Sequence, residues 1–244
     1  MGSIRAGVLR SRRMKYLFSP PPVTSAAIVG MAERFPVHRI YCVGSNYRAH
    51  AEEMGNTGRD PPVIFMKPVD ALLPVEVGAM GRLPYPSLTR NLHHEVELVV
   101  AIGEGGADIP VSAAQQHVFG YAVGLDMTRR DRQSEMKKRA GPWCIGKGCE
   151  HGAPLGPITP RTQVAQLDEG VIALSINGSE RQRGMLAQMI WSVPEIIAHL
   201  SAAWRLMPGD LVYTGTPAGV GPVERGDLIE ASVSGLEPLC VRLE

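Results

Sequence analysis

The chain has 244 residues, of which 44% are hydrophobic and 20% charged, and its formal net charge is +1. This composition is typical of a globular protein that can bury a substantial core. The near-neutral charge and the 5% of aromatic residues argue against a nucleic-acid partner. No apolar run approaches the ~20 residues that a membrane-spanning helix needs, so no membrane partner is expected.

Residues 1–35 are predicted to form an N-terminal tail with a short segment, and residues 36–244 one mixed, β-dominated domain. The first 32 residues contain no Asp or Glu. The four cysteines form no C-x-x-C pair, which favours a reduced, cytoplasmic protein.

Apolar and β-branched runs predict many strands and few helices. We expect strands at 39–43, 63–66, 93–102, 119–126, 171–176, 211–214, 227–233 and 238–243. We expect helices at 46–54 (capped by Asn46), 128–139 and 190–206. Asn177-Gly178 predicts a tight hairpin, and Ser192 with Glu195 predicts the start of the last helix.

Glu95 and Glu97 interrupt an apolar run with the alternation of a half-buried strand. Residues i and i+2 of a strand share a face, so the two carboxylates project together. Like charges on a buried face repel and lose hydration, so a divalent cation with oxygen ligands is one explanation. A solvated strand face is the other.

Asp126 ends the next apolar strand and is a candidate third oxygen ligand, although a helix N-cap would also explain it. Arg130 lies four residues further on, and Lys147 stands between two glycines in an apolar context. These cations suit a carboxylate or a developing enolate, although a loop lysine in solvent is the simpler alternative for Lys147.

His50 and Glu53 lie three residues apart on the expected helix 46–54, so their side chains can touch. Such a pair can act as a general base that takes a proton from water. An ordinary surface pair is the alternative interpretation.

Four segments together resemble the fumarylacetoacetate hydrolase superfamily: 41–50 (YCVGSNYRAH), 89–98 (TRNLHHEVEL), 124–131 (GLDMTRRD) and 214–222 (TGTPAGVGP). The resemblance runs in order from about residue 39 to the end. Residues 84–88 (PYPSL) and 190–193 (IWSV) look like the fumarylpyruvate hydrolases of gentisate breakdown.

The resemblance implies an α+β, β-dominated mixed β-roll, one Mg²⁺ or Mn²⁺ per subunit, and a homodimer. The metal ligands it implies are Glu95, Glu97 and Asp126. The catalytic residues it implies are His50, Glu53 and Lys147. The substrate-binding residues it implies are Arg130, Gln133, Tyr47 and Thr216.

The chain departs from the family pattern at two places beside the expected site. Ser45 stands where members often carry Arg, and Cys149-Glu150 stand where Phe-Asp is common. We expect these changes to shift substrate preference.

The function predicted is metal-dependent hydrolysis of the C–C bond of an acylpyruvate, with an α-keto acid as the small-molecule substrate. Fumarylpyruvate, cleaved to fumarate and pyruvate in gentisate-type aromatic breakdown, is the expected case. The alternatives are an oxaloacetate decarboxylase or other isomerase with metal–enolate chemistry, and a non-catalytic metal-stabilised scaffold.

Overall fold

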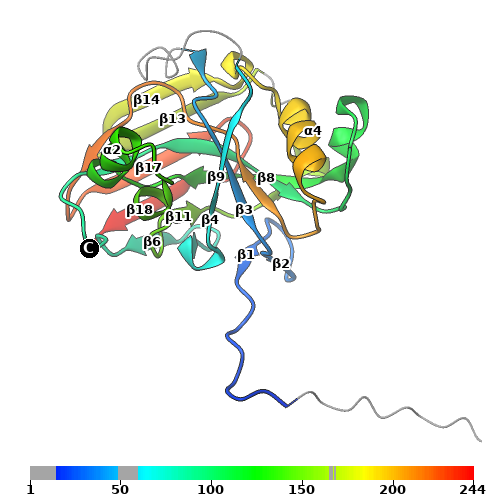
Figure 1. The fold of residues 1–244 in the computed structure, drawn as a ribbon, viewed down its shortest axis with the longest axis horizontal. Coiled ribbons are helices and arrows are strands. Elements are labelled where there is room, and N and C mark those ends of the chain that lie inside the picture. Colours follow the sequence, from blue (N-terminus) through cyan, green and yellow to red (C-terminus); the bar gives the residue numbers. More distant parts are fainter. Residues whose placement is uncertain (1–14, 49–59, 165–166, 168) are drawn as a thin grey trace, which may run out of the picture.

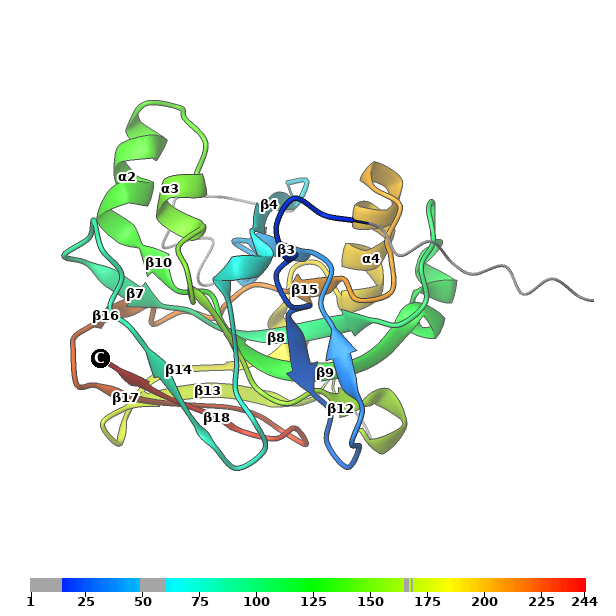
Figure 2. The same ribbon diagram turned by 90° about the horizontal axis from the view of Figure 1, so that it is seen from below.

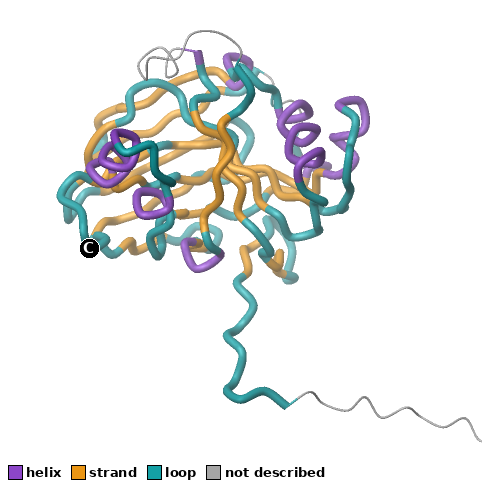
Figure 3. The backbone as a smooth tube through the Cα atoms, in the orientation of Figure 1, coloured by secondary structure: helices purple, strands orange, loops and turns teal. Residues whose placement is uncertain are grey.

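The computed structural model describes residues 15–48, 60–164, 167 and 169–244. Strands account for most of its ordered secondary structure and helices for little, which Figure 3 shows at a glance. The predicted α+β, β-dominated fold class is therefore confirmed.

The largest sheet has eight strands in the order β4-β3-β15-β8-β9-β11-β5, with β12 also paired to β9. Its members are β3 (Ile40–Gly44), β4 (Val63–Lys67), β5 (Leu72–Pro74), β8 (Val96–Ile102), β9 (Val118–Leu125), β11 (Ala153–Leu155), β12 (Thr159–Pro160) and β15 (Leu211–Tyr213). The sheet is mixed, because β15 runs parallel to β3 and antiparallel to β8.

A five-stranded sheet packs beneath it, as the two layers in Figure 2 show. In spatial order it contains β14 (Ser179–Met185), β13 (Val171–Ile176), β17 (Leu228–Val233), β18 (Leu239–Leu243) and β6 (Met80–Leu83). The hairpin between β13 and β14 turns at Asn177 and Gly178, whose φ angles are 51° and 78°. The predicted two-residue turn is confirmed.

The remaining described strands form two small sheets. One pairs β1 (Ser25–Ala27) with β2 (Arg34–Pro36), and the other has the order β10 (Thr128–Arg129), β7 (Leu92–His94), β16 (Gly221–Val223). Before β1, the described residues run away from the body of the molecule (Figure 1).

Among the described residues, three α-helices flank the large sheet, with α2 and α3 at one end and α4 at the other (Figures 1 and 2). They are α2 (Arg130–Lys138), α3 (Cys144–Lys147) and α4 (Val193–Ala203), and the 3-10 helices are η1 (Val69–Ala71), η2 (Val111–His117), η3 (Arg161–Gln163) and η4 (Leu186–Gln188). Helix α4 starts as predicted, because the Glu195 carboxylate accepts hydrogen bonds from the Ser192 backbone N–H at 2.9 Å and from its hydroxyl at 2.7 Å.

The prediction of a half-buried strand at 93–102 is wrong, because every residue of β8 is buried. One face of β8, with Leu98 and Val100, packs into the core shared with the five-stranded sheet and α4. The other face, with Val99 and Ala101, packs into a second core that includes residues of β1 and β2. Because β8 is a central strand covered on both sides, Glu97 has no solvated face, and Glu95, directly before the strand, is buried as well.

Candidate metal centre and active site

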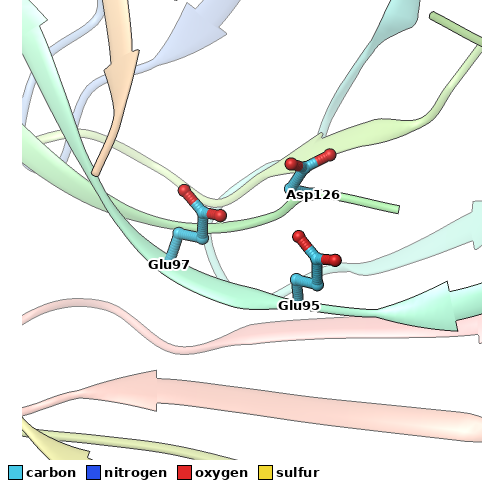
Figure 4. A group of neighbouring side chains, drawn as sticks. All are labelled: Glu95, Glu97 and Asp126. Atoms are coloured by element: carbon cyan, nitrogen blue, oxygen red, sulfur yellow. The ribbon is translucent and has the colours of Figure 1, made fainter. Parts of the chain in front are cut away.

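Three carboxylates meet on one side of the large sheet (Figure 4). Glu95 lies between β7 and β8, Glu97 on β8, and Asp126 directly after β9. The register of the two strands pairs Glu97 with Gly124, and the Asp126 N–H donates to the Glu95 backbone oxygen at 2.8 Å. One carboxylate oxygen from each residue lies within 4.8 Å of the others. The structure thus brings the three predicted ligands together.

Buried and partly buried cations surround this cluster. Lys147 Nζ lies 2.7 Å from Glu95 Oε2 and 2.7 Å from Asp126 Oδ2, so it bridges two of the carboxylates. The Arg130 guanidinium donates to Glu95 Oε1. Lys147 is only 3% exposed, which excludes the alternative of a solvated loop lysine.

Lys67 is a third cation at the cluster and is fully buried, and no local sequence pattern predicted its role. Its Nζ lies 2.8 Å from Asp126 Oδ1 and donates to the backbone oxygens of Met127, at 3.1 Å, and Lys147. The available signal was a lysine at the end of the apolar strand β4, just before Pro68. A lysine at the end of a strand is commonly solvated, so the sequence alone did not distinguish a solvated Lys67 from the buried Lys67 that the structure shows.

The charges of the cluster shift its pKa values in opposite directions. Burial, with the negative charges of Asp126 and Glu95, raises the pKa of Glu97 well above its usual range. Burial also opposes ionisation of Glu95, but Lys147 and Arg130 outweigh it and hold the pKa of that carboxyl below its usual range. Burial disfavours the Lys147 ammonium, yet the nearby carboxylates raise its pKa above the ordinary value. Lys147 therefore stays protonated at neutral pH.

The donor set fits a hard divalent cation such as Mg²⁺ or Mn²⁺, which prefers oxygen ligands. Asp126 Oδ1 is buried and, despite its contact with Lys67, accepts no well-directed hydrogen bond from the described residues. Glu97 accepts one from the Gly215 N–H at 2.7 Å. The pocket above the cluster holds about 20 Å³ of free space, room for one ion or water.

Helices α2 and α3 form one wall of this pocket. Arg130 Nη1 donates to Gln133 Oε1 at 2.5 Å, and Gln133 is buried. Gly146 allows α3 to approach α2, because a Cβ at this position would lie 2.9 Å from the Gln133 backbone nitrogen. This close approach places Lys147 over the carboxylates. The residues that line the pocket are Val43, Gly44, Ser45, Phe65, Glu95, Glu97, Asp126, Arg130, Gln133, Lys137, Trp143, Lys147 and Thr216.

Gln182 on β14 connects the ligand strand to the loop that carries Thr216, and the sequence analysis missed it. Its Oε1 accepts from the Val96 N–H at 3.0 Å and lies 2.9 Å from His94 Nδ1. Its Nε2 donates to Thr216 Oγ1 at 2.8 Å and to the Pro217 oxygen at 2.9 Å. Because Thr216 Oγ1 accepts from Gln182, the Thr216 hydroxyl proton is free to point into the pocket.

The remaining predicted site residues are not brought to the pocket by the described structure. Tyr47 is 2% exposed in the main core and is absent from the described pocket lining, so its substrate contact stays a prediction. Burial, with the charge of Glu97, raises the pKa of Tyr47. His50 and Glu53 lie outside the described residues, as does most of the helix expected at 46–54.

The family profile described as "Fumarylacetoacetate (FAA) hydrolase C-terminal" matches residues 39–244. The chain belongs to the fumarylacetoacetate hydrolase family. Within it, the chain is similar to the crystal structure of fumarylpyruvate hydrolase from Pseudomonas aeruginosa in complex with Mn²⁺ and pyruvate. The identity is 51% and the TM-score 0.92, and the match covers 94% of this chain and 99% of that one.

Other family members that resemble the chain carry different activities in their names. The mitochondrial oxaloacetate tautomerase FAHD1 of Arabidopsis thaliana is 42% identical over 198 residues, 81% of this chain and 87% of that protein. The mitochondrial oxaloacetate decarboxylase of Dictyostelium discoideum is 38% identical over 199 residues, 82% of this chain and 90% of that protein.

Family membership and the carboxylate cluster together make the protein a metal-dependent enzyme of the fumarylacetoacetate hydrolase family. None of the helices in the described part of the chain has the length and apolar character needed to cross a membrane. The division into residues 1–35 and 36–244 and the cytoplasmic location stay predictions.

Proposed function

We propose that the enzyme hydrolyses the C–C bond of an acylpyruvate, with fumarylpyruvate as the substrate and fumarate and pyruvate as the products. The observation that carries this proposal is the buried cluster of Glu95, Glu97 and Asp126 bridged by Lys147. The similarity to a fumarylpyruvate hydrolase supports it. That match covers 94% of the chain, so it extends beyond the region shared with the whole family, which begins at residue 39.

Glu95, Glu97 and Asp126 would hold the Mg²⁺ or Mn²⁺, which supplies Lewis-acid activation of the α-keto acid and stabilises developing negative charge. The contacts of Lys147 with two of these carboxylates fix its ammonium beside the same place. Because Lys147 stays protonated, it acts as a hydrogen-bond donor to an enolate oxygen and not as a general base. We assign Arg130 and the Thr216 hydroxyl, which both line the pocket, to binding of the substrate carboxylate.

The hydrolytic step needs a base for water, and we assign it to His50 and Glu53. Water loses a proton to this pair and adds to the distal ketone. The C–C bond on the pyruvate side of that carbon then breaks, and its electron pair forms the pyruvate enolate. Protonation of the enolate carbon gives pyruvate, and the acyl carbon leaves as the carboxylate of fumarate.

Oxaloacetate tautomerisation or decarboxylation is the second candidate, and the names of the similar tautomerases and decarboxylase favour it. These reactions use the same enolate stabilisation without attack by water. The third alternative, a non-catalytic scaffold, does not explain why Lys147, Arg130 and Thr216 surround the cluster.

A substrate panel tests the proposal. Purified protein with added Mg²⁺ or Mn²⁺ is given fumarylpyruvate, maleylpyruvate, acetylpyruvate and oxaloacetate, while enol absorbance is followed and products are identified. We expect pyruvate and fumarate from fumarylpyruvate, and activity that EDTA abolishes while the fold is retained. Activity on oxaloacetate alone would overturn the proposal. Full hydrolysis by His50→Gln or Glu53→Gln would sink only the assignment of the base.

We also propose that the enzyme acts as a homodimer in gentisate-type aromatic breakdown. The segment that runs away from the body of the molecule supports the dimer (Figure 1). It carries the large hydrophobic side chains of Tyr16, Leu17 and Phe18, which are exposed and which a second copy of the chain would cover. Light scattering coupled to size-exclusion chromatography measures the mass directly.

A further inference from the structure

A second, larger cavity lies on the other face of β8 from the carboxylates. Its volume is about 680 Å³, within the roughly 300–1,000 Å³ of typical small-molecule pockets. Leu98 lines it, and consecutive residues of a strand point to opposite faces, so β8 itself separates this cavity from Glu97. The described linings of the cavity and of the metal pocket have no residue in common. The cavity is therefore a separate site.

The walls of this cavity are mostly aliphatic. Leu98, Leu186 and Val193 are buried, and they come from β8, η4 and the start of α4. Val164 and Met189 are partly buried and pack beside them. The flexible thioether of a methionine adapts to the shape of an apolar partner. Such walls fit an alkyl chain.

The rim of the cavity carries hydrogen-bond donors. Arg161 and Gln115 both line the cavity and are exposed. Arg161 Nε donates to the Val118 backbone oxygen at 3.3 Å, and no acidic side chain among the described residues pairs with this guanidinium. The Tyr121 hydroxyl donates to Gln115 Oε1 at 2.9 Å, which leaves the Gln115 amide N–H groups to face a ligand. Both contacts are made to the first half of β9, so the guanidinium and the amide lie on the same side of the cavity.

We infer that this cavity binds a medium-chain aliphatic carboxylate. The carboxylate lies at the rim, where the Arg161 guanidinium and the Gln115 amide donate to it. The alkyl chain extends inward along the aliphatic walls. Charge complementarity selects this class, because an uncharged chain leaves the guanidinium unmatched and a dicarboxylate buries its second charge against aliphatic side chains. The inference does not depend on the reaction at the metal centre.

Isothermal titration calorimetry with hexanoate and octanoate as probes tests the inference on the full-length, Mn²⁺-loaded protein. Octanoate should bind about tenfold more tightly, because each of its two additional methylene groups strengthens binding by roughly threefold to fourfold when it is buried. The affinity for octanoate should be the same in EDTA, since the cavity is separate from the metal ligands. Equal affinities for the two probes, no binding of either, or binding that requires Mn²⁺ would overturn the inference.

Two variants locate the bound probe. Arg161→Met removes the cation at the rim and should weaken octanoate binding by about tenfold. Ala187→Phe places a larger side chain in the lining and should weaken it by at least as much. Arg205→Met is the matched control, because Arg205 is exposed and absent from the described lining, and it should leave the affinity unchanged. Unaltered octanoate binding by Arg161→Met, with its fold verified by thermal melting, would refute the assignment even if Ala187→Phe does not fold.

Discussion

Replacing Lys67 with Met removes the buried cation that supports Asp126 and keeps a side chain of similar length. The Lys67 side chain is fully buried and contacts Asp126 Oδ1 at 2.8 Å. It also donates to the backbone oxygens of Met127 and Lys147. The substitution therefore leaves one carboxylate oxygen without its ion-pair partner and two carbonyl groups without their hydrogen-bond donor.

The expected loss in the free energy of unfolding is about 3 kcal/mol. Removing one partner of a buried ion pair costs roughly 3–5 kcal/mol, because the other charge stays buried without compensation. The low end applies here, since Asp126 Oδ2 keeps its contact with Lys147 at 2.7 Å. For a chain of this size, this loss lowers the melting temperature by about 6–12 °C.

Urea unfolding of the metal-free protein in EDTA, at one fixed protein concentration, measures this loss. Lys138→Met serves as the surface control and should change stability by less than ~0.5 kcal/mol. Saturating Mn²⁺ should reduce the deficit of Lys67→Met, because a cation bound at the cluster again compensates the charge of Asp126.

A loss below ~1 kcal/mol for Lys67→Met would refute this reasoning. So would additivity in the double-mutant cycle with Asp126→Asn, because removing the carboxylate charge should recover part of what the missing lysine costs. The double variant also keeps the prediction testable if Lys67→Met alone does not fold.

The remaining predictions concern pH and the polar network. Because the pKa of Glu97 is raised, the metal-free protein should lose stability as the pH rises above 4.5, whereas Glu97→Gln should not show this loss in urea titrations. For the same reason Mn²⁺ binding should release about one proton from Glu97 and become tighter as the pH rises. Calorimetry in buffers of different ionisation enthalpy measures this release, and its absence would contradict the raised pKa. Burial, with the charge of Arg130, lowers the pKa of His93 to about 4 from 6.5, so its neutral form should add stability that is lost as the pH falls from 6.5 toward 4. His93→Gln should flatten that part of the stability profile. Gln182→Leu should cost about 2–4 kcal/mol, because several buried groups lose their partners, and unchanged urea unfolding would show that the network is dispensable.

Local sequence signals predicted the parts of the fold that short-range physics controls. The Asn177-Gly178 turn needs positive φ at both residues, and the two residues have it. Ser192 and Glu195 start α4 through contacts only three residues apart. The same locality explains why the spacing of Glu95 and Glu97 was enough to predict that their carboxylates project together, although Glu95 lies between two strands.

What the sequence did not predict depends on contacts between distant segments. Gln182 accepts a hydrogen bond from the Val96 N–H although the two residues are 86 positions apart, and no residue pattern around Gln182 predicts this contact. Lys67 lies 60 positions from Met127, whose carbonyl it binds. The burial of both faces of β8 could not be predicted either. The alternation of side chains along one strand shows which residues share a face, but it does not show which other segments cover that face.

The three carboxylates and the helical wall of the pocket belong to different parts of the molecule. Glu95, Glu97 and Asp126 are fixed by the register of paired strands in the middle of a sheet, whereas one wall of the pocket is formed by the short helices α2 and α3 at its end. Substrate range can therefore drift during evolution while the chemistry is inherited unchanged. A directed-evolution library confined to the pocket-lining residues Ser45 and Lys137 would vary the pocket wall and leave the three carboxylates unchanged.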